Sequence, residues 1–200
     1  MRKKKWIIKT LSFVGLCLFI LSETIMADDK MSAEEFLKSK LDQVFVVLQK
    51  EDLGQPEKDN QIVEIVTPMF DFALMAKLSL GRKHWTGLSE ENKERFTELF
   101  IKRLRRSYLN KFILYTDEKI IYEAPVEASE KIQIPTNLIS KDKKISMVYK
   151  LYKSNDSWKI YDIEIQGVSI IRSYRSQFDE ILQSGSFDDL LLKLEKPIDN

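Results

Sequence analysis

Two apolar segments joined by a short polar turn restrict the fold of this chain more than any other feature. Apolar and polar residues alternate from Ile145 to Leu151, and a second apolar segment runs from Trp158 to Gln166. The turn Ser154–Asn155–Asp156–Ser157 lies between them, so the pattern predicts an antiparallel hairpin. A chain with this hairpin builds an antiparallel sheet, which needs a covering layer on its apolar face.

Two further segments extend the expected sheet. Ile120–Tyr122 is a short strand, and Ile132–Ile139 is a longer one whose Pro135 favours an edge position, because proline has no N–H to donate. In the last strand, period-two alternation places Ile163 on the face opposite to Ile160. Together the segments predict a twisted antiparallel sheet of about four strands.

Helical periodicity flanks the strands on both sides. Ser32 and Glu35 form a capping-box pattern at the start of the first helix, and Gly54 and Pro56 end it. The expected helices cover residues 32–48, 60–66, 70–80, 90–114, 168–183 and 187–194. Helices before and after a run of strands predict an α+β fold with helices packed on one face of the sheet.

The first 27 residues have the pattern of a secretory signal peptide. Basic residues open the chain, Leu11–Leu21 is apolar, and Ala27 precedes a charged segment. This apolar stretch is too short for a membrane-spanning helix, which needs roughly 20 residues. We therefore expect export and cleavage, leaving residues 28–200 as a single domain. Ile25 is larger than usual for its place before the cut, so cleavage a few residues away, or an uncleaved anchor, stays open.

The charge and cysteine content of the remaining 173 residues restrict which partners they can bind and whether they can form disulfides. Without the five basic residues and one acidic residue of the leader, 27 Lys+Arg stand against 30 Asp+Glu, a formal charge of −3. That near balance argues against nucleic acid as a partner. Cys17, the only cysteine, lies in the leader, so no disulfide can form within residues 28–200. We expect a soluble monomer.

Few residues of the chain are suited to catalysis or metal binding. His84 is the only histidine, and no G-x-S-x-G nucleophile motif occurs. A zinc site needs several histidine or cysteine ligands, which the chain does not supply. Asp162 and Glu164 have the spacing of an acid–base pair, but surface or salt-bridged charges share this spacing far more often. We therefore expect no enzyme, no cofactor and no metal.

Apolar side chains on the expected helices and strands suit either a packed core or a cavity for acyl chains. A twisted sheet wrapped by helices can enclose acyl chains, and each methylene removed from water contributes about 0.8 kcal/mol. The candidate lining residues are Phe70, Phe72, Met75, Phe96, Phe100, Leu104, Tyr108, Met147, Tyr149 and Ile163. From the apolar pattern alone, core packing is the more frequent explanation for each of them.

The helix expected over residues 90–114 also carries a basic face. Its members are Lys93, Arg95, Lys102, Arg103, Arg105, Arg106 and Lys111. Such a face is usually solvated, and the alternative is a docking surface for an anionic membrane or a partner protein.

Two sets of motifs are specific when taken together. Near the C-terminus, Ser157–Ser169 reads SWKIYDIEIQGVS and is followed by Tyr174–Phe178, which reads YRSQF. Upstream lie Phe70–Phe72, which reads FDF, the Leu80–Trp85 loop and the aromatic series from Phe96 to Tyr108. Over nearly the whole of the chain after the leader, these motifs resemble those of the MlaC family, also called the toluene-tolerance auxiliary family.

This resemblance implies a periplasmic phospholipid-binding protein of an ABC-type lipid transport system. The implied partners are phospholipid, an inner-membrane complex that carries an MCE-domain ring and an ABC transporter, and an outer-membrane lipoprotein complex. The implied fold is a curved antiparallel sheet whose helices form a pocket for acyl chains. Tyr174 and Arg175 match the family motif and join the candidate lipid-binding residues. Arg175 either pairs with a lipid phosphate or anchors the fold through Asp162.

Three alternatives to phospholipid shuttling remain at this point. Related members of the family handle hopanoids, so a hopanoid-like lipid is one alternative substrate. A folded adaptor that bridges two membrane complexes without carrying lipid is another. An enzyme acting on a lipid is the third, and it would require His84, or Asp162 with Glu164, to act chemically.

Overall fold

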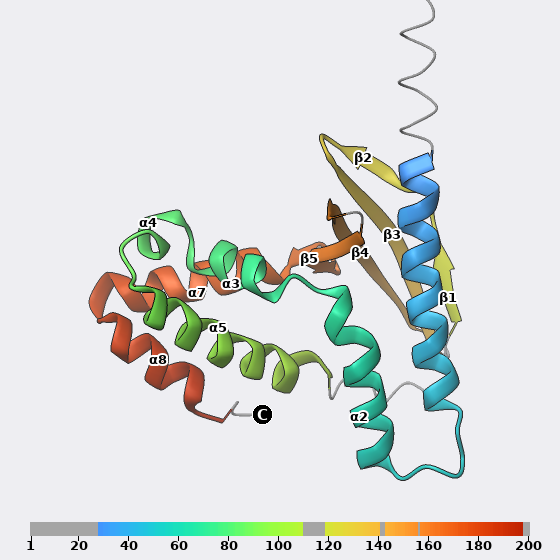
Figure 1. Cartoon of the computed structure of the whole chain (residues 1–200), viewed down its shortest axis with the longest axis horizontal. Helices are drawn as coiled ribbons and strands as arrows, with labels where there is room; N and C mark the ends of the chain where they lie inside the picture. Colours follow the sequence, from blue (N-terminus) through green and yellow to red (C-terminus); the bar gives the residue numbers. More distant parts are fainter. Residues whose placement is uncertain (1–27, 110–118, 141–142, 156, 198–200) are drawn as a thin grey trace, which may run out of the picture.

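One antiparallel sheet organises the chain, with helices along it and beside it (Figure 1). The computed structural model describes residues 28–109, 119–140, 143–155 and 157–197. The strands among them are β1 (Lys119–Tyr122), β2 (Val126–Ala128), β3 (Lys131–Ser140), β4 (Lys143–Ser154), β5 (Ser157–Ile165) and β6 (Val168–Ser169). Their order is β1-β3-β4-β5-β6, and β2 also pairs with β3. The described sheet thus has six strands rather than about four, because β2 and β6 are too short to show a periodic pattern.

The helices comprise an N-terminal helix and several that follow it. The N-terminal helix covers residues 28–48. The others are α2 (Gln55–Val66), the 3-10 turn η1 (Thr67–Met69), α3 (Phe72–Leu80), α4 (Arg82–Trp85), α5 (Glu90–Leu104), α7 (Ile170–Ser184) and α8 (Phe187–Glu195). A π-helical turn, η2 (Arg105–Leu109), continues α5. The expected signal peptide and the expected end of this helix at residue 114 lie outside the described residues.

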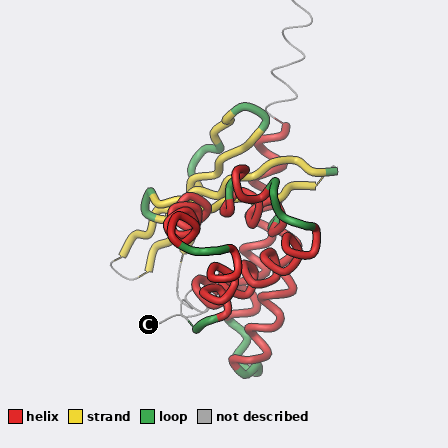
Figure 2. Tube along the Cα trace, turned by 90° about the vertical axis from the view of Figure 1, so that its left-hand side faces the viewer, coloured by secondary structure: helices red, strands yellow, loops and turns green. Residues whose placement is uncertain are grey.

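The elements separate into a strand layer and a helical layer. Seen from the side in Figure 2, the strands lie together in the upper part of the molecule and most helices lie below them. The helices α3, α5, α7 and α8 pack on one another beside the sheet (Figure 1). This arrangement is the α+β class that the order of the segments predicts.

Pro135 lies inside the sheet, so its predicted edge position is wrong. β3 pairs with β4 along its length, and its other side pairs with β2 up to Gln133 and with β1 from Thr136 onward. The Glu123 N–H donates to the Pro135 carbonyl oxygen at 2.9 Å, so the nitrogen of Pro135 also faces the junction between β1 and β2. A residue without an N–H is tolerated where one partner strand ends and the next begins.

A β-bulge in β5 changes which residues share the apolar face. Tyr149 pairs with Ile163 and Leu151 pairs with Ile160, so β5 has one more residue than β4 between these pairs. Since Tyr149 and Leu151 lie two apart, Ile163 and Ile160 point to the same side of the sheet. The expectation that these two isoleucines face opposite ways is therefore wrong.

The N-terminal helix lies along the sheet and is fixed at its start by polar contacts. It is already helical at residue 28, so the predicted start at Ser32 is wrong. Ser32 Oγ instead donates to the Asp29 carbonyl oxygen at 3.1 Å and accepts from Trp158 Nε1 at 3.1 Å. Lys153 Nζ contacts the Asp29 carboxylate at 2.8 Å. Further along, Leu37 is fully buried against the main core.

The buried apolar residues form two clusters. The larger one joins the apolar face of the sheet to the N-terminal helix, α3, α5, α7 and α8. The smaller one, made of Val47, Leu48 and Ile62, holds the end of the N-terminal helix against α2. These two helices therefore contact each other through a separate apolar cluster.

Candidate functional site

An apolar cavity lies between the sheet and the helices that cover it. Its volume is about 140 Å³. Its wall combines the N-terminal helix, α2, η1, α3, the end of α5, β4, β5 and the start of α7. The lining residues are Leu41, Val44, Ile62, Val63, Val66, Thr67, Met69, Phe70, Phe72, Met75, Leu104, Arg105, Tyr149, Ile163 and Ile170.

The lining changes from buried to exposed along the cavity. Met75, Tyr149 and Ile163 are buried, with at most 5% of their surface exposed. Thr67, Phe70 and Phe72 are half-buried, and Arg105 is exposed. The cavity therefore has a buried floor at the sheet and a mouth where Arg105 meets solvent.

Tyr149 lies at this floor and is the only tyrosine among the described lining residues. Burial, with a smaller effect of Tyr122, raises the pKa of the Tyr149 phenol. The phenol therefore stays neutral near neutral pH, and the floor carries no charge. An uncharged, water-poor floor suits hydrocarbon and disfavours an ion.

Half of the residues expected to bind lipid line this cavity. They are Phe70, Phe72, Met75, Leu104, Tyr149 and Ile163. They come from four separate parts of the chain, namely the segment from η1 to α3, the end of α5, β4 and β5, which the fold brings together around one space.

Phe96, Phe100 and Tyr174 lie instead in an aromatic cluster between α5 and α7. The ring centroids of Phe100 and Tyr174 are 5.3 Å apart, and those of Phe96 and Phe178 are 5.6 Å apart, both edge-to-face. Such pairs contribute about 0.5–1.5 kcal/mol beyond burial. The Tyr174 hydroxyl also lies 3.1 Å from Ser107 Oγ. In this structure these side chains hold α5 against α7.

Met147 and Tyr108 complete the expected set. Met147 is 3% exposed and belongs to the main core, outside the cavity wall. Tyr108 lies in the π-helical turn η2, and its side chain is outside the described residues.

Arg175 lies outside the lining of this cavity, and its hydrogen bonds within the described residues go to α3 and not to Asp162. Its guanidinium donates from Nε to the Leu78 carbonyl oxygen at 2.9 Å, and its Nη2 donates to the same oxygen. The guanidinium thus caps the C-terminal turn of α3, where carbonyl oxygens lack helical partners. The expectation that Arg175 anchors the fold through Asp162 is corrected accordingly, although Arg175 does connect α7 to α3.

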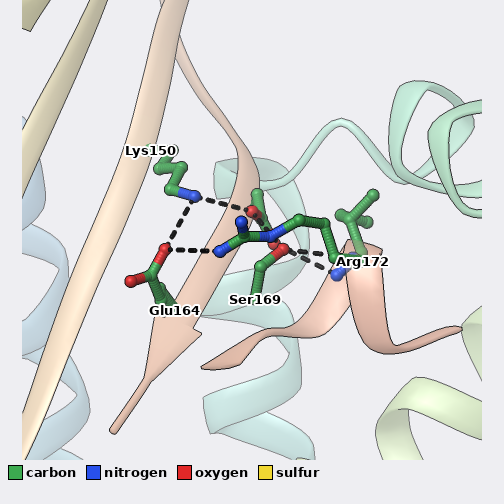
Figure 3. A network of polar contacts seen from close by, with 6 residues as sticks. Lys150, Glu164, Ser169 and Arg172 are labelled. Carbon is green, nitrogen blue, oxygen red and sulfur yellow. Dashed lines mark hydrogen bonds and ion pairs between the residues drawn. The ribbon is translucent and has the colours of Figure 1, made fainter. Parts of the chain in front are cut away.

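Asp162 has other partners, which form a network at the start of α7. Its carboxylate accepts from Ser169 Oγ at 2.7 Å and from the Ile171 N–H at 3.2 Å. Lys150 Nζ lies 3.1 Å from Asp162 and 3.0 Å from Glu164, and Arg172 Nη2 lies 3.3 Å from Glu164. Figure 3 shows Lys150, Glu164, Ser169 and Arg172 of this network.

This network gives the two carboxylates a structural role. Burial alone would lower the pKa of Lys150, but hydrogen bonds to Glu164 and Asp162 outweigh it and raise this pKa. The ammonium therefore stays charged and forms ion pairs with both acids. Ser169, the N-cap of α7, also accepts from the Arg172 N–H at 3.1 Å. The acid–base spacing in the sequence thus corresponds to a salt-bridged helix cap.

A tight turn places Ser169 beside Asp162. Ile165 pairs with Val168, so Gln166 and Gly167 are the two central residues of a hairpin turn. Their φ angles are 51° and 80°, both in the left-handed region that glycine adopts at little cost.

Sequence patterns missed several lining residues. Leu41, Val44, Ile62 and Val66 lie on apolar helix faces, but periodicity does not tell a cavity wall from a core. Arg105 belongs to the basic face of the helix after Ser89, and the charge pattern does not distinguish it from its basic neighbours. The signal that would have found it is its place directly after Leu104, a residue of the apolar stripe.

Within the described ranges, the structure offers no group of three or more His, Cys, Asp or Glu side chains arranged to hold a metal ion. His84 Nε2 lies 3.4 Å from Asp179 Oδ1, between α4 and α7. None of the helices described here has both the length and the apolar character required to cross a membrane.

Comparison with known proteins places the whole fold in one family. The family model described as "MlaC protein" matches residues 38–196. The binding protein MlaC of the intermembrane phospholipid transport system of Haemophilus influenzae is 26% identical over 203 residues, which cover 96% of this chain and 92% of that protein.

A solved structure shares the fold. It is a phospholipid-binding protein from Ralstonia solanacearum in complex with a phospholipid, with a TM-score of 0.73 and 24% identity. The similarity covers 82% of this chain and 94% of that one. The arrangement of sheet and helices described above is therefore one that a known protein also adopts.

Proposed function

The chain belongs to the MlaC family, and from this membership and the apolar cavity we propose that it binds a phospholipid and carries it between membranes. The observation that supports this most directly is the lining of the cavity, which is apolar from its floor to its mouth and carries a charge at the mouth. This distribution matches an amphiphile with acyl chains inside and a polar headgroup outside.

The energetics of transport require such a lining. An acyl chain of about 16 carbons gains on the order of 12 kcal/mol from leaving water, so a carrier must offer comparable burial. The apolar lining residues contribute to this burial, and the neutral Tyr149 adds no charged group that would have to be desolvated. A charged floor would oppose loading.

The volume of the cavity indicates how acyl chains enter. About 140 Å³ is less than the roughly 300–1,000 Å³ of common small-molecule sites. Acyl chains therefore require the wall to widen. The N-terminal helix and α2 contact each other through their own cluster of Val47, Leu48 and Ile62, so this part of the wall can shift with less disturbance of the main core.

The finer parts of the proposal concern place and partners. The leader supports export to the periplasm, and the name of the Haemophilus influenzae relative supports a role in intermembrane phospholipid transport. We infer a shuttle that receives lipid from one membrane complex and delivers it to another, with an inner-membrane ABC transporter complex and an outer-membrane lipoprotein complex as partners.

Two other functions fit part of the same observations. A hopanoid-like lipid would also occupy an apolar cavity, but it does not call for a cation at the mouth. An adaptor that carries no lipid would fold without needing the cavity. We favour the phospholipid because it accounts for both the apolar lining and the charge of Arg105.

We also infer that the protein has no catalytic role. Asp162 and Glu164 are held by Lys150 and Arg172, and His84 lies beside Asp179, with neither residue in the cavity lining. His84→Ala should leave lipid loading unchanged, with no altered lipid in either protein. A chemically changed lipid produced by the unmodified chain alone would contradict this.

Mass spectrometry tests the central proposal. The protein is purified from a bacterial periplasm without detergent, and its native mass is compared with its denatured mass. We expect a stoichiometric phospholipid that is released on denaturation. A hopanoid in its place would favour the alternative lipid. A protein without lipid, unchanged after incubation with phospholipid vesicles, would leave the adaptor as the better explanation.

A further inference from the structure

Arg105 is the one charged side chain in the described lining of the cavity. The rest of the lining is apolar apart from the hydroxyls of Thr67 and Tyr149. Arg105 is exposed, whereas Leu104 before it is 7% exposed and faces the cavity from the core. The guanidinium therefore stands where the apolar space meets water.

The backbone changes from α-helix to π-helix at the same residue. α5 ends at Leu104, and the π-helical turn begins at Arg105. Fewer than about 1% of residues adopt π-helix, and such turns occur frequently at functional sites. The wider turn alters the direction of the side chains that follow Leu104, and it does so at the mouth of the cavity.

Neighbouring arginines of the same face are engaged elsewhere. Arg103 donates to the Lys196 carbonyl oxygen at 3.1 Å, and Arg106 donates to the Glu195 carbonyl oxygen at 3.5 Å, both at the end of α8. Within the described residues, Arg105 donates one long hydrogen bond, of 3.4 Å, to Thr67 Oγ1. Most of its five N–H donors thus stay available for a ligand at the cavity mouth.

We propose that Arg105, assisted by the Thr67 hydroxyl, binds the phosphate group of the lipid whose acyl chains occupy the cavity. This inference rests on the proposed function and adds to it a preference for lipids that carry a phosphate next to the glycerol. A guanidinium binds two phosphate oxygens at once through parallel N–H donors, which an ammonium does not reproduce. Arg105 is thus a specificity residue at the boundary between cavity and solvent.

Two lipids with identical acyl chains test this assignment. Vesicles of dioleoylphosphatidylglycerol containing a minor fraction of dioleoylglycerol are incubated with the purified chain, and bound lipids are quantified by native mass spectrometry. The ratio of the two bound lipids is normalised to their mole fractions. A charge-assisted contact predicts a preference of about tenfold for the phosphate-bearing lipid.

Variants distinguish a specific effect of Arg105 from the effect of positive charge on this helix in general. Arg105→Gln should lower the preference to near one while dioleoylglycerol still loads, and Arg105→Lys should give an intermediate ratio. Arg106→Gln removes a neighbouring arginine outside the lining and should retain the preference of the unmodified chain. Circular dichroism of each variant checks that the fold is kept.

Other outcomes overturn the assignment in distinguishable ways. If Arg105→Gln retains the full preference, the headgroup contact is wrong and the carrier function stands. If the unmodified chain loads neither lipid, both the inference and the proposed function fall. If chloride abolishes the preference as completely as inorganic phosphate does at matched ionic strength, the preference reflects general charge attraction and the phosphate contact is wrong; a loss caused by inorganic phosphate alone supports the assignment.

Discussion

Ser169 donates a hydrogen bond of 2.7 Å to the buried carboxylate of Asp162 and thereby joins the start of α7 to β5. The same hydroxyl accepts from the Arg172 N–H, so one side chain both caps the helix and binds the strand. Lys150 Nζ lies 3.1 Å from the same carboxylate and adds an ion pair to this contact.

Asp162→Asn is expected to destabilise the protein strongly. The amide of the variant retains one hydrogen-bond acceptor but loses the ion pair with Lys150. Lys150 still has Glu164 as an ion-pair partner in this variant. We expect a loss of about 3 kcal/mol in the free energy of unfolding, the lower end for breaking a buried pair. Urea unfolding measures it. Asp42→Asn, an exposed change on the N-terminal helix, serves as the control, and equal losses in both variants would contradict the assignment.

Gly167→Ala tests the turn that places Ser169. An added Cβ meets no atom within 4 Å, so the cost comes from the φ of 80° alone. A non-glycine residue in this conformation costs roughly 1–2 kcal/mol. Gly87→Ala is the matched control, since its Cβ makes ordinary contact at 3.9 Å and no positive φ is involved. Thermal unfolding of both variants should show a lower midpoint for the first alone.

Val66→Phe is expected to block the cavity without unfolding the protein. The larger ring occupies space that acyl chains need, while filling a cavity commonly adds about 0.5–2 kcal/mol of stability. We expect several-fold less bound lipid together with an unchanged or higher midpoint of unfolding. Val46→Phe is the control because Val46 is exposed on the outer face of its helix. Normal loading of the Val66 variant would show that the cavity is not the binding site.

The raised pKa values of two tyrosines predict that the protein loses stability in alkaline solution. Burial first, then Asp42 and Glu34, raises the pKa of Tyr122 from 10.0 to about 12, and burial also raises the pKa of Tyr149. Above pH 10.0 the unfolded chain loses these protons while the folded chain keeps them. The free energy of unfolding should therefore be unaffected by these phenols below pH 10.0 and fall as the pH rises toward 12.

A double variant checks this alkaline effect. Tyr122→Phe with Tyr149→Phe removes both phenols and should reduce the fall in the urea midpoint between about pH 9 and about pH 11. Part of the fall remains, because the raised pKa of Lys150 also contributes stability that is lost above its usual value of 10.5. An unchanged pH profile would show that the two phenols ionise alike in both states.

The sequence predicted those helix ends and turns that depend on residues close together in the chain. Ser89 is the N-cap of α5 and accepts from the Asn92 N–H, and Gly81 ends α3 with a φ of 80°. The hairpin of β4 and β5 follows from alternation and its polar turn. Each of these depends on neighbours along the chain, so each could be predicted from sequence.

The errors share a different origin, in contacts between distant segments. The bulge near Tyr161 arises from the pairing of β5 with β4. Pro135 is tolerated inside the sheet because β2 pairs with the first part of β3 and β1 with the rest. The partner of Arg175 is a carbonyl oxygen 97 residues away, at Leu78. For the cavity, the sequence predicted apolar side chains but not which of them face empty space and which face each other.

The contact between Ser32 and Trp158 spans 126 residues, and this separation has a kinetic consequence. The N-terminal helix is made long before β5, the strand that receives it. Pairings between remote segments form late and slow folding. The helix that forms one wall of the cavity therefore docks only after β5 is available, and until then its apolar face, including Leu37, stays uncovered.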